Sequence, residues 1–222
     1  MIPCVVYITA AVLTPELSAL WKQNMKGSNC TFRYFDDARV LQSASQLGIR
    51  RYVDAVRPWA FKVDLWRYAQ ALESGGIFFD AELQLYKPPE HIFNLEADVL
   101  QVPRDRNPHC LFNAIMAAPA RSPAMRRVLI RALSNVRKKT YGHEDSAKEP
   151  WLGITGPCTM AAALRRDRGF PKDVKIIGSY PSPAALDLNG NRIALSNDAV
   201  KRTIITDVGH YGTFWGQHTV YA

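Results

Sequence analysis

The chain has 222 residues, of which 47% are hydrophobic and 22% are charged, and its formal net charge is +8. This composition is ordinary for a globular α/β domain and excludes a disordered or low-complexity chain. The excess of positive charge can give solubility or attract an anionic partner. We therefore expect one globular domain over residues 1–222.

The first residues form an apolar run that is rich in β-branched side chains and has no basic segment before it. The run is too short for a signal peptide, and no later stretch reaches membrane-spanning length, so we expect a soluble, cytoplasmic protein. The cysteines form no C-x-x-C pair and lie far apart, at Cys4, Cys30, Cys110 and Cys158. This spacing favours free thiols in a reducing compartment over a zinc site or a disulfide framework.

Predicted strands and helices alternate along the chain with short links. The predicted strands are an opening run that ends at Thr9 and the segments 31–35, 77–79, 83–86, 98–102, 111–116 and 174–177. The predicted helices begin after Thr14, cover 59–73 and 125–136, and begin again at 156–157. This alternation favours a mainly parallel sheet covered by helices.

Much of the positive charge falls on the predicted helix 125–136. Met125, Val128 and Leu129 recur there at helical spacing, so Arg126 and Arg127 belong to its polar face. Such a face could meet nucleic acid or the surface of an anionic membrane. No RNA-binding aromatic signature or zinc finger accompanies it, which disfavours a nucleic-acid partner and leaves peripheral membrane contact open.

The predicted helix 59–73 carries a charged pair beside its apolar stripe. Asp64 and Arg67 are three residues apart, so their side chains can touch on the helix. A surface ion pair of this kind contributes less than about 1 kcal/mol to stability, and this structural interpretation stays open.

Two acids follow the apolar run 76–79. Asp80 and Glu82 are two residues apart, so on an extended segment their side chains point to the same side and their charges converge. Hard oxygen ligands with open positions suit Mg²⁺ or Mn²⁺, particularly where substrate phosphates complete the coordination. Two solvated carboxylates in a turn are the alternative, because a D-x-E pattern is common by chance.

Taken together, these segments resemble the core of the sugar-nucleotide glycosyltransferases with a DXD motif. That group includes the yeast-type initiating α-mannosyltransferases, the capsular polysaccharide transferases and, more distantly, the clostridial glucosylating toxins. The central block runs from Phe61 to Tyr68, continues from Glu73 to Glu82 and closes at Lys87-Pro88. Weaker matches are Trp21, the segments 34–37, 113–118 and 155–157, and the element from Gly209 to Trp215.

The resemblance implies a GT-A fold, a Rossmann-like sheet with the donor site beyond the carboxyl ends of its strands. It implies that Asp80 contacts ribose and metal, that Glu82 contacts the metal, and that Asp64 and Arg67 bind the donor sugar. Two positions depart from the family pattern. Glu82 stands where the family has aspartate, which puts metal affinity in question, and Val63 replaces a serine or threonine.

The resemblance also implies several outlying contacts. Tyr7 and Thr9 would line the base pocket, although a plain strand end is an equal interpretation. Gly76 and Gly156 would lie in the donor site, with the acceptor approaching near Gly156 and Asn113. His210 would bind the metal and Trp215 would close over the diphosphate, although a lone histidine is usually an ordinary surface or core residue.

The function implied is a metal-dependent, retaining hexosyltransferase. It would use Mn²⁺ or Mg²⁺ to move a sugar from a nucleotide sugar, with UDP favoured by the resemblance alone, to a hydroxyl of a glycan or glycoconjugate. A non-catalytic nucleotide-sugar or carbohydrate-binding module is the main alternative. A Mg²⁺-dependent phosphatase of the haloacid-dehalogenase type is disfavoured, because its motif has aspartate as the second acid and lies near the N-terminus.

Overall fold

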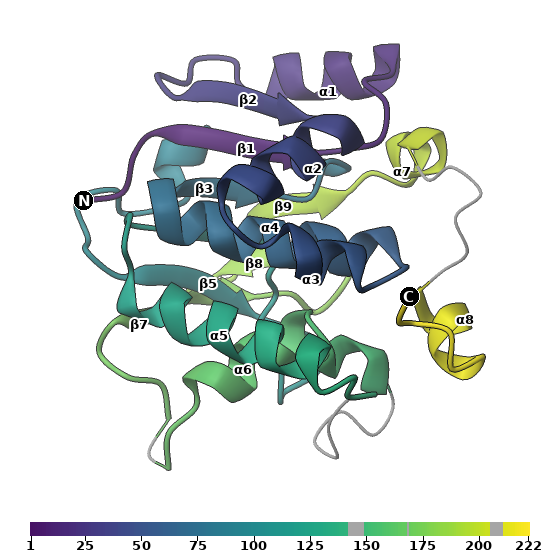
Figure 1. Cartoon of the computed structure of the whole chain (residues 1–222). Helices are drawn as coiled ribbons and strands as arrows, with labels where there is room; N and C mark the ends of the chain where they lie inside the picture. Colours follow the sequence, from purple (N-terminus) through teal and green to yellow (C-terminus); the bar gives the residue numbers. More distant parts are fainter. Residues whose placement is uncertain (142–148, 168, 205–210) are drawn as a thin grey trace.

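The computed structural model describes residues 1–141, 149–167, 169–204 and 211–222 (Figure 1). The described strands form one sheet in the order β2-β1-β3-β6-β5-β7-β8-β9-β4. They are β1 (Val5–Thr9), β2 (Thr31–Phe35), β3 (Gly76–Phe79), β4 (Leu83–Leu85), β5 (Leu100–Arg104), β6 (Ile115–Ala118), β7 (Val174–Ser179), β8 (Ala184–Asp187) and β9 (Arg192–Ser196).

The α-helices are α1 (Pro15–Asn24), α2 (Asp37–Gln46), α3 (Arg50–Asp54), α4 (Trp59–Ser74), α5 (Pro123–Arg137), α6 (Pro157–Leu164), α7 (Asp198–Ile204) and α8 (Tyr211–Gly216). Short 3₁₀ turns cover Pro89–His91 and Pro150–Gly153. Helix α1 begins as predicted, since Thr14 caps it by accepting a hydrogen bond from the backbone nitrogen of Leu17 at 3.2 Å.

The sheet is mixed, so the prediction of a mainly parallel sheet is wrong. Parallel pairing joins β1 to β2 and β3, and β5 to β7, whereas β6, β8, β9 and β4 pair antiparallel with their neighbours. Only residues 188–191 separate β8 from β9. A link of this length is too short for the crossover that parallel neighbours need, and the two strands form a hairpin.

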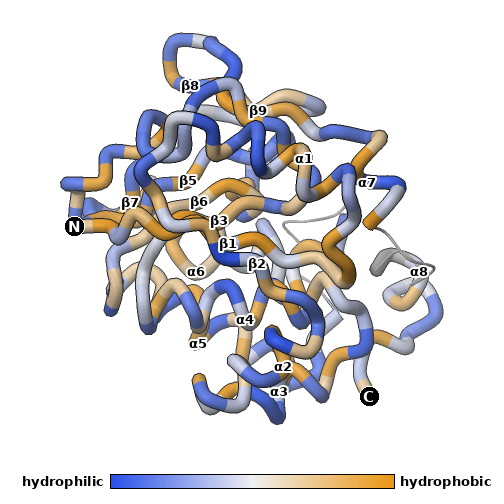
Figure 2. The backbone as a smooth tube through the Cα atoms, turned by 90° about the horizontal axis from the view of Figure 1, so that it is seen from above, coloured by the Kyte–Doolittle hydropathy of each residue, from blue (hydrophilic) through white to orange (hydrophobic). Residues whose placement is uncertain are grey.

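Helices α2 to α6 lie on one side of the sheet, as Figure 2 shows for α2, α3, α4 and α5 beneath β1, β3 and β6. Strand β3 is buried at every residue, and its side chains alternate between two cores. Phe78 packs into the core under these helices, whereas Ile77 and Phe79 pack into the core shared with α1, β4 and β9. The residue after Phe79 therefore points back toward α4.

The last strand of the sheet, β4, returns close to β3 because only Asp80, Ala81 and Glu82 separate the two strands. Helix α1 holds this turn in place. Trp21 donates from its indole nitrogen to the carbonyl oxygen of Ala81 at 2.7 Å. Asn24 contacts the backbone of β4, donating to the oxygen of Leu83 at 2.7 Å and accepting from the nitrogen of Leu85 at 2.9 Å. Helix α1 thus fixes the acidic turn at its middle residue and at the strand that follows it.

All four cysteines are paired, as Cys4–Cys30 and Cys110–Cys158, so the prediction of free thiols is wrong. The spacing of the cysteines in the sequence did not reveal the pairing, because each disulfide joins two segments that are distant in sequence and adjacent only in the folded chain. Cys4 and Cys30 directly precede the parallel neighbours β1 and β2. Disulfides are typical of oxidising compartments, so the cysteines no longer support the predicted reducing compartment.

Within the described residues, no helix combines the length and the apolar character that crossing a bilayer would require. The basic helix α5 is amphipathic as predicted, with Met125, Val128 and Leu129 buried. Its Arg127 forms an ion pair with Asp173, while Arg126 is exposed. Contact of α5 with an anionic membrane stays a prediction.

Candidate functional site

A cavity of about 400 Å³ lies where β3 ends and α6 begins. Its wall includes Asp64 from α4, the turn residues Asp80 and Glu82, and Gly156 at the start of α6. The structure therefore brings the central sequence-predicted residues to one place. The end of β3 supplies two of the acids, as the position of the D-x-E pattern indicates.

Arg67 is the buried cation behind this wall. Its side chain is 5% exposed, and its Nη2 lies 2.5 Å from Oδ1 of Asp80, whose side chain is 38% exposed. A second hydrogen bond runs from Nη1 of Arg67 to the carbonyl oxygen of Asn113 at 2.5 Å. The charge of Asp80 raises the pKa of Arg67, although burial alone would lower it. Arg67 thus ties α4 to the turn after β3 and to the segment before β6.

Asp64 has polar partners other than Arg67. Its Oδ1 accepts from Nδ2 of Asn113 at 2.8 Å, and its Oδ2 accepts from the hydroxyl of Thr155 at 3.0 Å. The contact expected between Asp64 and Arg67 is replaced by the Arg67–Asp80 pair, because alternation along β3 turns Asp80 toward α4. Burial raises the pKa of Asp64 to about 6, against the opposing effects of Arg67 and the two hydrogen bonds.

Glu82 is a second acid in the cavity with a raised pKa. Burial first, and then the negative charge of Asp80, raise its pKa to about 7. Lys201 of α7 also lines the cavity and lowers this pKa by its positive charge. Lys201 is near because the backbone nitrogen of Asn197, just before α7, donates to the carbonyl oxygen of Glu82 at 3.0 Å. Sequence analysis did not identify Lys201.

The donor set fits a hard divalent cation held in part by a substrate. The negative charge of Asp80 disfavours the ionised form of Glu82, and a bound cation would relieve this repulsion. Within the described part of the chain, three potential ligands converge within 4.8 Å of one another only at Cys4, Cys30 and Glu90, where the cysteines form a disulfide. The cavity therefore presents no complete protein cage, and water or phosphate oxygens would complete the coordination.

Other predicted residues lie elsewhere. Tyr7 is 2% exposed and stacks on Phe78, with ring centroids 4.8 Å apart, so it lies in the core. Gly76 is at the opposite end of β3 from Asp80, and a Cβ there would lie 2.7 Å from the ring of Tyr7. Both residues serve packing in this structure. Thr9 ends β1 and does not line the cavity in the described part of the chain.

The C-terminal element is only partly described. His210 lies outside the described residues. Trp215 is in α8, where its indole nitrogen donates to the carbonyl oxygen of Tyr141 at 2.8 Å. Its ring also meets Trp151 edge-on at 5.9 Å between centroids. Gly156, in contrast, is at the cavity, where an added Cβ would lie 3.5 Å from Oδ2 of Asp64.

The outer wall of the cavity contains residues that sequence analysis missed. Arg106 forms an ion pair with Glu149 at 2.7 Å, and Phe112 stacks on Tyr180 with ring centroids 3.8 Å apart. Phe112 immediately precedes Asn113, which belongs to the recognised segment 113–118. Its place next to that segment could have identified it as a residue of the site. Arg106 and Glu149 stand in segments without regular periodicity and gave no such signal.

Comparisons with known proteins give a match in structure and none in sequence. No protein-family model matches the chain, and no curated protein matches it in sequence. Among solved structures, it is similar to one described as "PaToxG Glycosyltransferase", with 13% identity and a TM-score of 0.49. The match covers 73% of this chain and 68% of that one.

Proposed function

We propose that the chain is a metal-dependent glycosyltransferase that moves a sugar from a nucleotide sugar to a hydroxyl acceptor. The observation that carries the proposal is the clustering of Asp64, Asp80 and Glu82 around one cavity, with Arg67 buried behind them. The motif resemblance supports the same reading. UDP as the nucleotide, retention of configuration and a glycan or glycoconjugate acceptor rest on that resemblance.

Charge in the cavity supports the requirement for a cation. Arg67 donates to one oxygen of Asp80, while Glu82 adds a second negative charge that burial makes unfavourable. A divalent cation would be held by Asp80 and Glu82, and it would neutralise the charge that grows on a departing diphosphate. Lys201 lines the same cavity and adds a positive charge that can bind phosphate oxygens.

Asp64 is suited to orient a sugar. Asn113 and Thr155 each donate to a different oxygen of its carboxylate, so its direction is fixed before any ligand arrives. Gly156 leaves room beside this carboxylate, since the space that a Cβ would occupy lies 3.5 Å from Oδ2. A sugar hydroxyl entering there could donate to the carboxylate of Asp64. Prior orientation of this kind reduces the entropy cost of positioning the reacting groups.

The binding-module alternative predicts the same ligand without turnover. Thermal-shift measurements with a panel of nucleotide sugars, with and without Mn²⁺, should show stabilisation only when both are present. The stabilising donors are then incubated with Mn²⁺, and release of nucleoside diphosphate is measured. Turnover supports a transferase, whereas stabilisation without release supports the binding module and release of inorganic phosphate supports a phosphatase.

A matched pair of variants completes the test. Asp80→Asn removes a proposed metal ligand, and Asp173→Asn makes the same change in the ion pair with Arg127, away from the cavity. We expect the Asp80 variant to lose Mn²⁺-dependent stabilisation and the Asp173 variant to retain it. Equal stabilisation of both variants would contradict the proposed metal site.

A further inference from the structure

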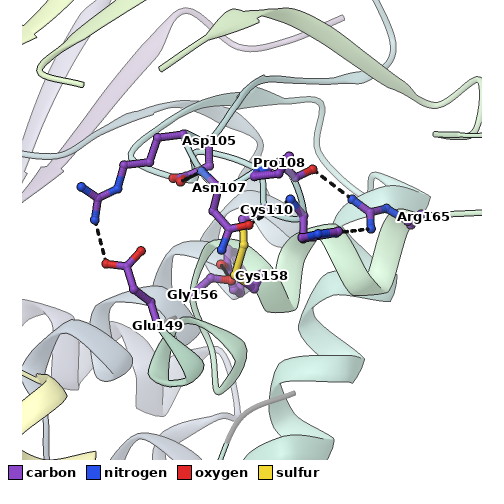
Figure 3. Close-up of a disulfide and its surroundings, with 11 residues drawn as sticks. Asp105, Asn107, Pro108, Cys110, Glu149, Gly156, Cys158 and Arg165 are labelled. Carbon is purple, nitrogen blue, oxygen red and sulfur yellow. Dashed lines mark hydrogen bonds and ion pairs between the residues drawn. A yellow bond between two sulfur atoms is a disulfide. The ribbon is translucent and has the colours of Figure 1, made fainter. Parts of the chain in front are cut away.

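The disulfide Cys110–Cys158 lies directly beside the proposed site (Figure 3). It joins two segments that are 48 residues apart in sequence: the loop after β5 and the start of α6. Asn113 follows Cys110 by three positions, and Thr155 precedes Cys158 by three positions. The bridge therefore connects the two segments that hold the carboxylate of Asp64.

Other contacts also cross this join, among them the ion pair of Arg106 with Glu149 at 2.7 Å and the contact of Arg165 with His109 at 3.4 Å. The backbone nitrogen of Leu111 donates to the carbonyl oxygen of Pro157 at 3.2 Å, and Arg165 reaches the carbonyl oxygen of Pro108 at 3.3 Å. The second of these contacts is exposed. Opening the disulfide would thus leave the segments adjacent but less restrained. Each controls one hydrogen bond to Asp64, so its orientation depends on their alignment.

A second cavity, of about 450 Å³, is lined in part by Cys158 of this disulfide. Cys158, which is 5% exposed, is part of its wall, together with His109, Arg165, Arg166 and Asp167. A positively charged cavity attracts anions and favours the thiolate form of an entering thiol. The thiolate is the species that attacks a disulfide.

We propose that this cavity is a thiol-exchange site for a small anionic thiol, and that exchange at Cys158 controls the orientation of Asp64. The entering thiolate attacks Sγ of Cys158 and forms a mixed disulfide, while the bond to Cys110 breaks and Cys110 leaves as a thiolate that takes a proton from water. A second thiol then attacks the mixed disulfide, releases Cys158 as a thiol and leaves the two small thiols joined in their own disulfide.

The other disulfide provides a matched control. Cys4–Cys30 lies at the amino ends of β1 and β2, whereas Asp80 follows the carboxyl end of their parallel neighbour β3. Cys4–Cys30 is therefore remote from the site, and its cysteines do not line the second cavity among the described residues. The proposal predicts that thiols open Cys110–Cys158 faster than Cys4–Cys30, and that only the opening of Cys110–Cys158 changes the orientation of Asp64.

The first experiment measures exchange without reference to any enzymatic activity. The native chain is incubated with reduced glutathione or with neutral 2-mercaptoethanol, and the released cysteines are alkylated and located by mass spectrometry. We expect glutathione to open Cys110–Cys158 before Cys4–Cys30. Exposure alone predicts the opposite order, because Cys110 and Cys158 are buried whereas Cys4 and Cys30 are partly exposed. Preferential opening of Cys4–Cys30, or equal rates for the two bridges, would overturn the proposal.

Charge variants test the role of the arginines. Arg165→Gln combined with Arg166→Gln should slow opening by glutathione roughly fourfold at low salt, because each charge near an attacking anion in water contributes a factor of about two. The rate with 2-mercaptoethanol should fall less, because its attacking thiolate carries one negative charge whereas glutathione adds two carboxylates. This difference excludes a general effect on the loop. Arg126→Gln, an exposed change outside this cavity, is the control. An equal loss with both thiols would contradict the anion-binding role.

The second experiment tests control of Asp64, and only its activity readout rests on the proposed function. Hydrogen exchange should become faster at residues 152–157 and 110–114 after thiol treatment of the native chain, and the Cys110→Ser/Cys158→Ser variant should reproduce the change. Cys4→Ser/Cys30→Ser should not. If hydrogen exchange is unchanged after opening of Cys110–Cys158 has been confirmed, the proposed control of Asp64 is wrong. Turnover of the sugar donor should fall when the disulfide is opened. If the protein with its disulfides intact shows no donor turnover either, the proposed function is refuted, whereas the thiol-exchange proposal still stands.

Discussion

Among the described residues, two of the arginine–aspartate pairs join a helix to the end of a strand distant in sequence, and they differ in their surroundings. Arg127 of α5 contacts Asp173 before β7 at 2.8 Å, with side chains 29% and 27% exposed. Arg67 of α4 contacts Asp80 after β3 at 2.5 Å, with side chains 5% and 38% exposed. At the second pair the cation is buried and the acid faces a cavity.

The neighbours of the two pairs explain what this difference means. Around Arg67, the carboxylates of Asp64 and Glu82 share the cavity with Asp80, so the acids outnumber this buried cation. Around Arg127, both oxygens of Asp173 bind one guanidinium nitrogen, at 2.9 and 2.8 Å. The surface pair matches one charge with one charge and has the character of a structural contact. The cavity pair has an excess of negative charge, which folding alone does not require.

The largest expected effect separates the two aspartates. With a nucleotide sugar and Mn²⁺, Asp80→Asn should lower donor turnover by at least about 100-fold, because metal stabilisation of a transition state contributes several kcal/mol. Asp173→Asn should change turnover less than about twofold. Steady-state release of nucleoside diphosphate measures both. Similar losses in the two variants would remove the functional distinction between the pairs.

The two arginines should differ in stability. Arg67→Met should lower the free energy of unfolding by about 3 kcal/mol, because it leaves Asp80 and the carbonyl oxygen of Asn113 without a buried donor. Arg127→Met should cost less than about 1 kcal/mol, as usual for partly exposed pairs. Urea denaturation followed by circular dichroism gives both values. Equal costs would show that the burial of Arg67 has no energetic consequence.

Glu82 tests whether the excess charge holds a metal. Glu82→Gln preserves size and removes charge, so it should raise the Mn²⁺ concentration for half-maximal turnover by more than about 10-fold. Glu82→Asp keeps the charge, restores the usual family residue and should shift this concentration modestly in either direction. Titration of Mn²⁺ at fixed donor concentration measures both shifts. An unchanged requirement in the Gln variant would remove Glu82 from the metal site and favour the binding module.

The smallest effect concerns Asp64 and pH. Because its pKa is raised from 3.8 to about 6, the folded chain keeps a proton that the unfolded chain releases between these values. Stability from this group is therefore present at low pH and lost as pH rises through about 6. In EDTA, Asp64→Asn should gain about 2 kcal/mol relative to the original chain between pH 4 and pH 7, because each unit of the pKa shift corresponds to about 1.4 kcal/mol; turnover should fall. A constant stability difference across this range would contradict the shifted pKa.

Local signals in the sequence predicted most elements of the first half of the chain. The Thr14 cap, the helix 59–73 and the strand 31–35 are confirmed, because short-range spacing determines each of them. Strands β8 and β9 were missed, although Asn189-Gly190 between them is a typical hairpin turn. The mixed sheet was missed because strand order depends on contacts between distant segments.

The site was also predicted only in part, because its residues come both from one short block and from distant segments. Asp64, Asp80 and Glu82 stood in a recognisable block and do share a cavity. Their partners could not be derived from spacing: Thr155 lies 91 residues from Asp64, and the Cys110–Cys158 bridge spans 48. Whether the site binds a metal and a donor sugar stays a prediction.

The contact between Asn24 and β4 has a consequence for how the chain behaves in solution. An edge strand offers unpaired backbone groups to any other strand and can recruit a second copy of the chain. The carboxamide of Asn24 satisfies the oxygen of Leu83 and the nitrogen of Leu85, as a neighbouring strand would. One side chain thus shields this border of the sheet against aggregation, and the opposite border, β2, is the one that needs protection by other means.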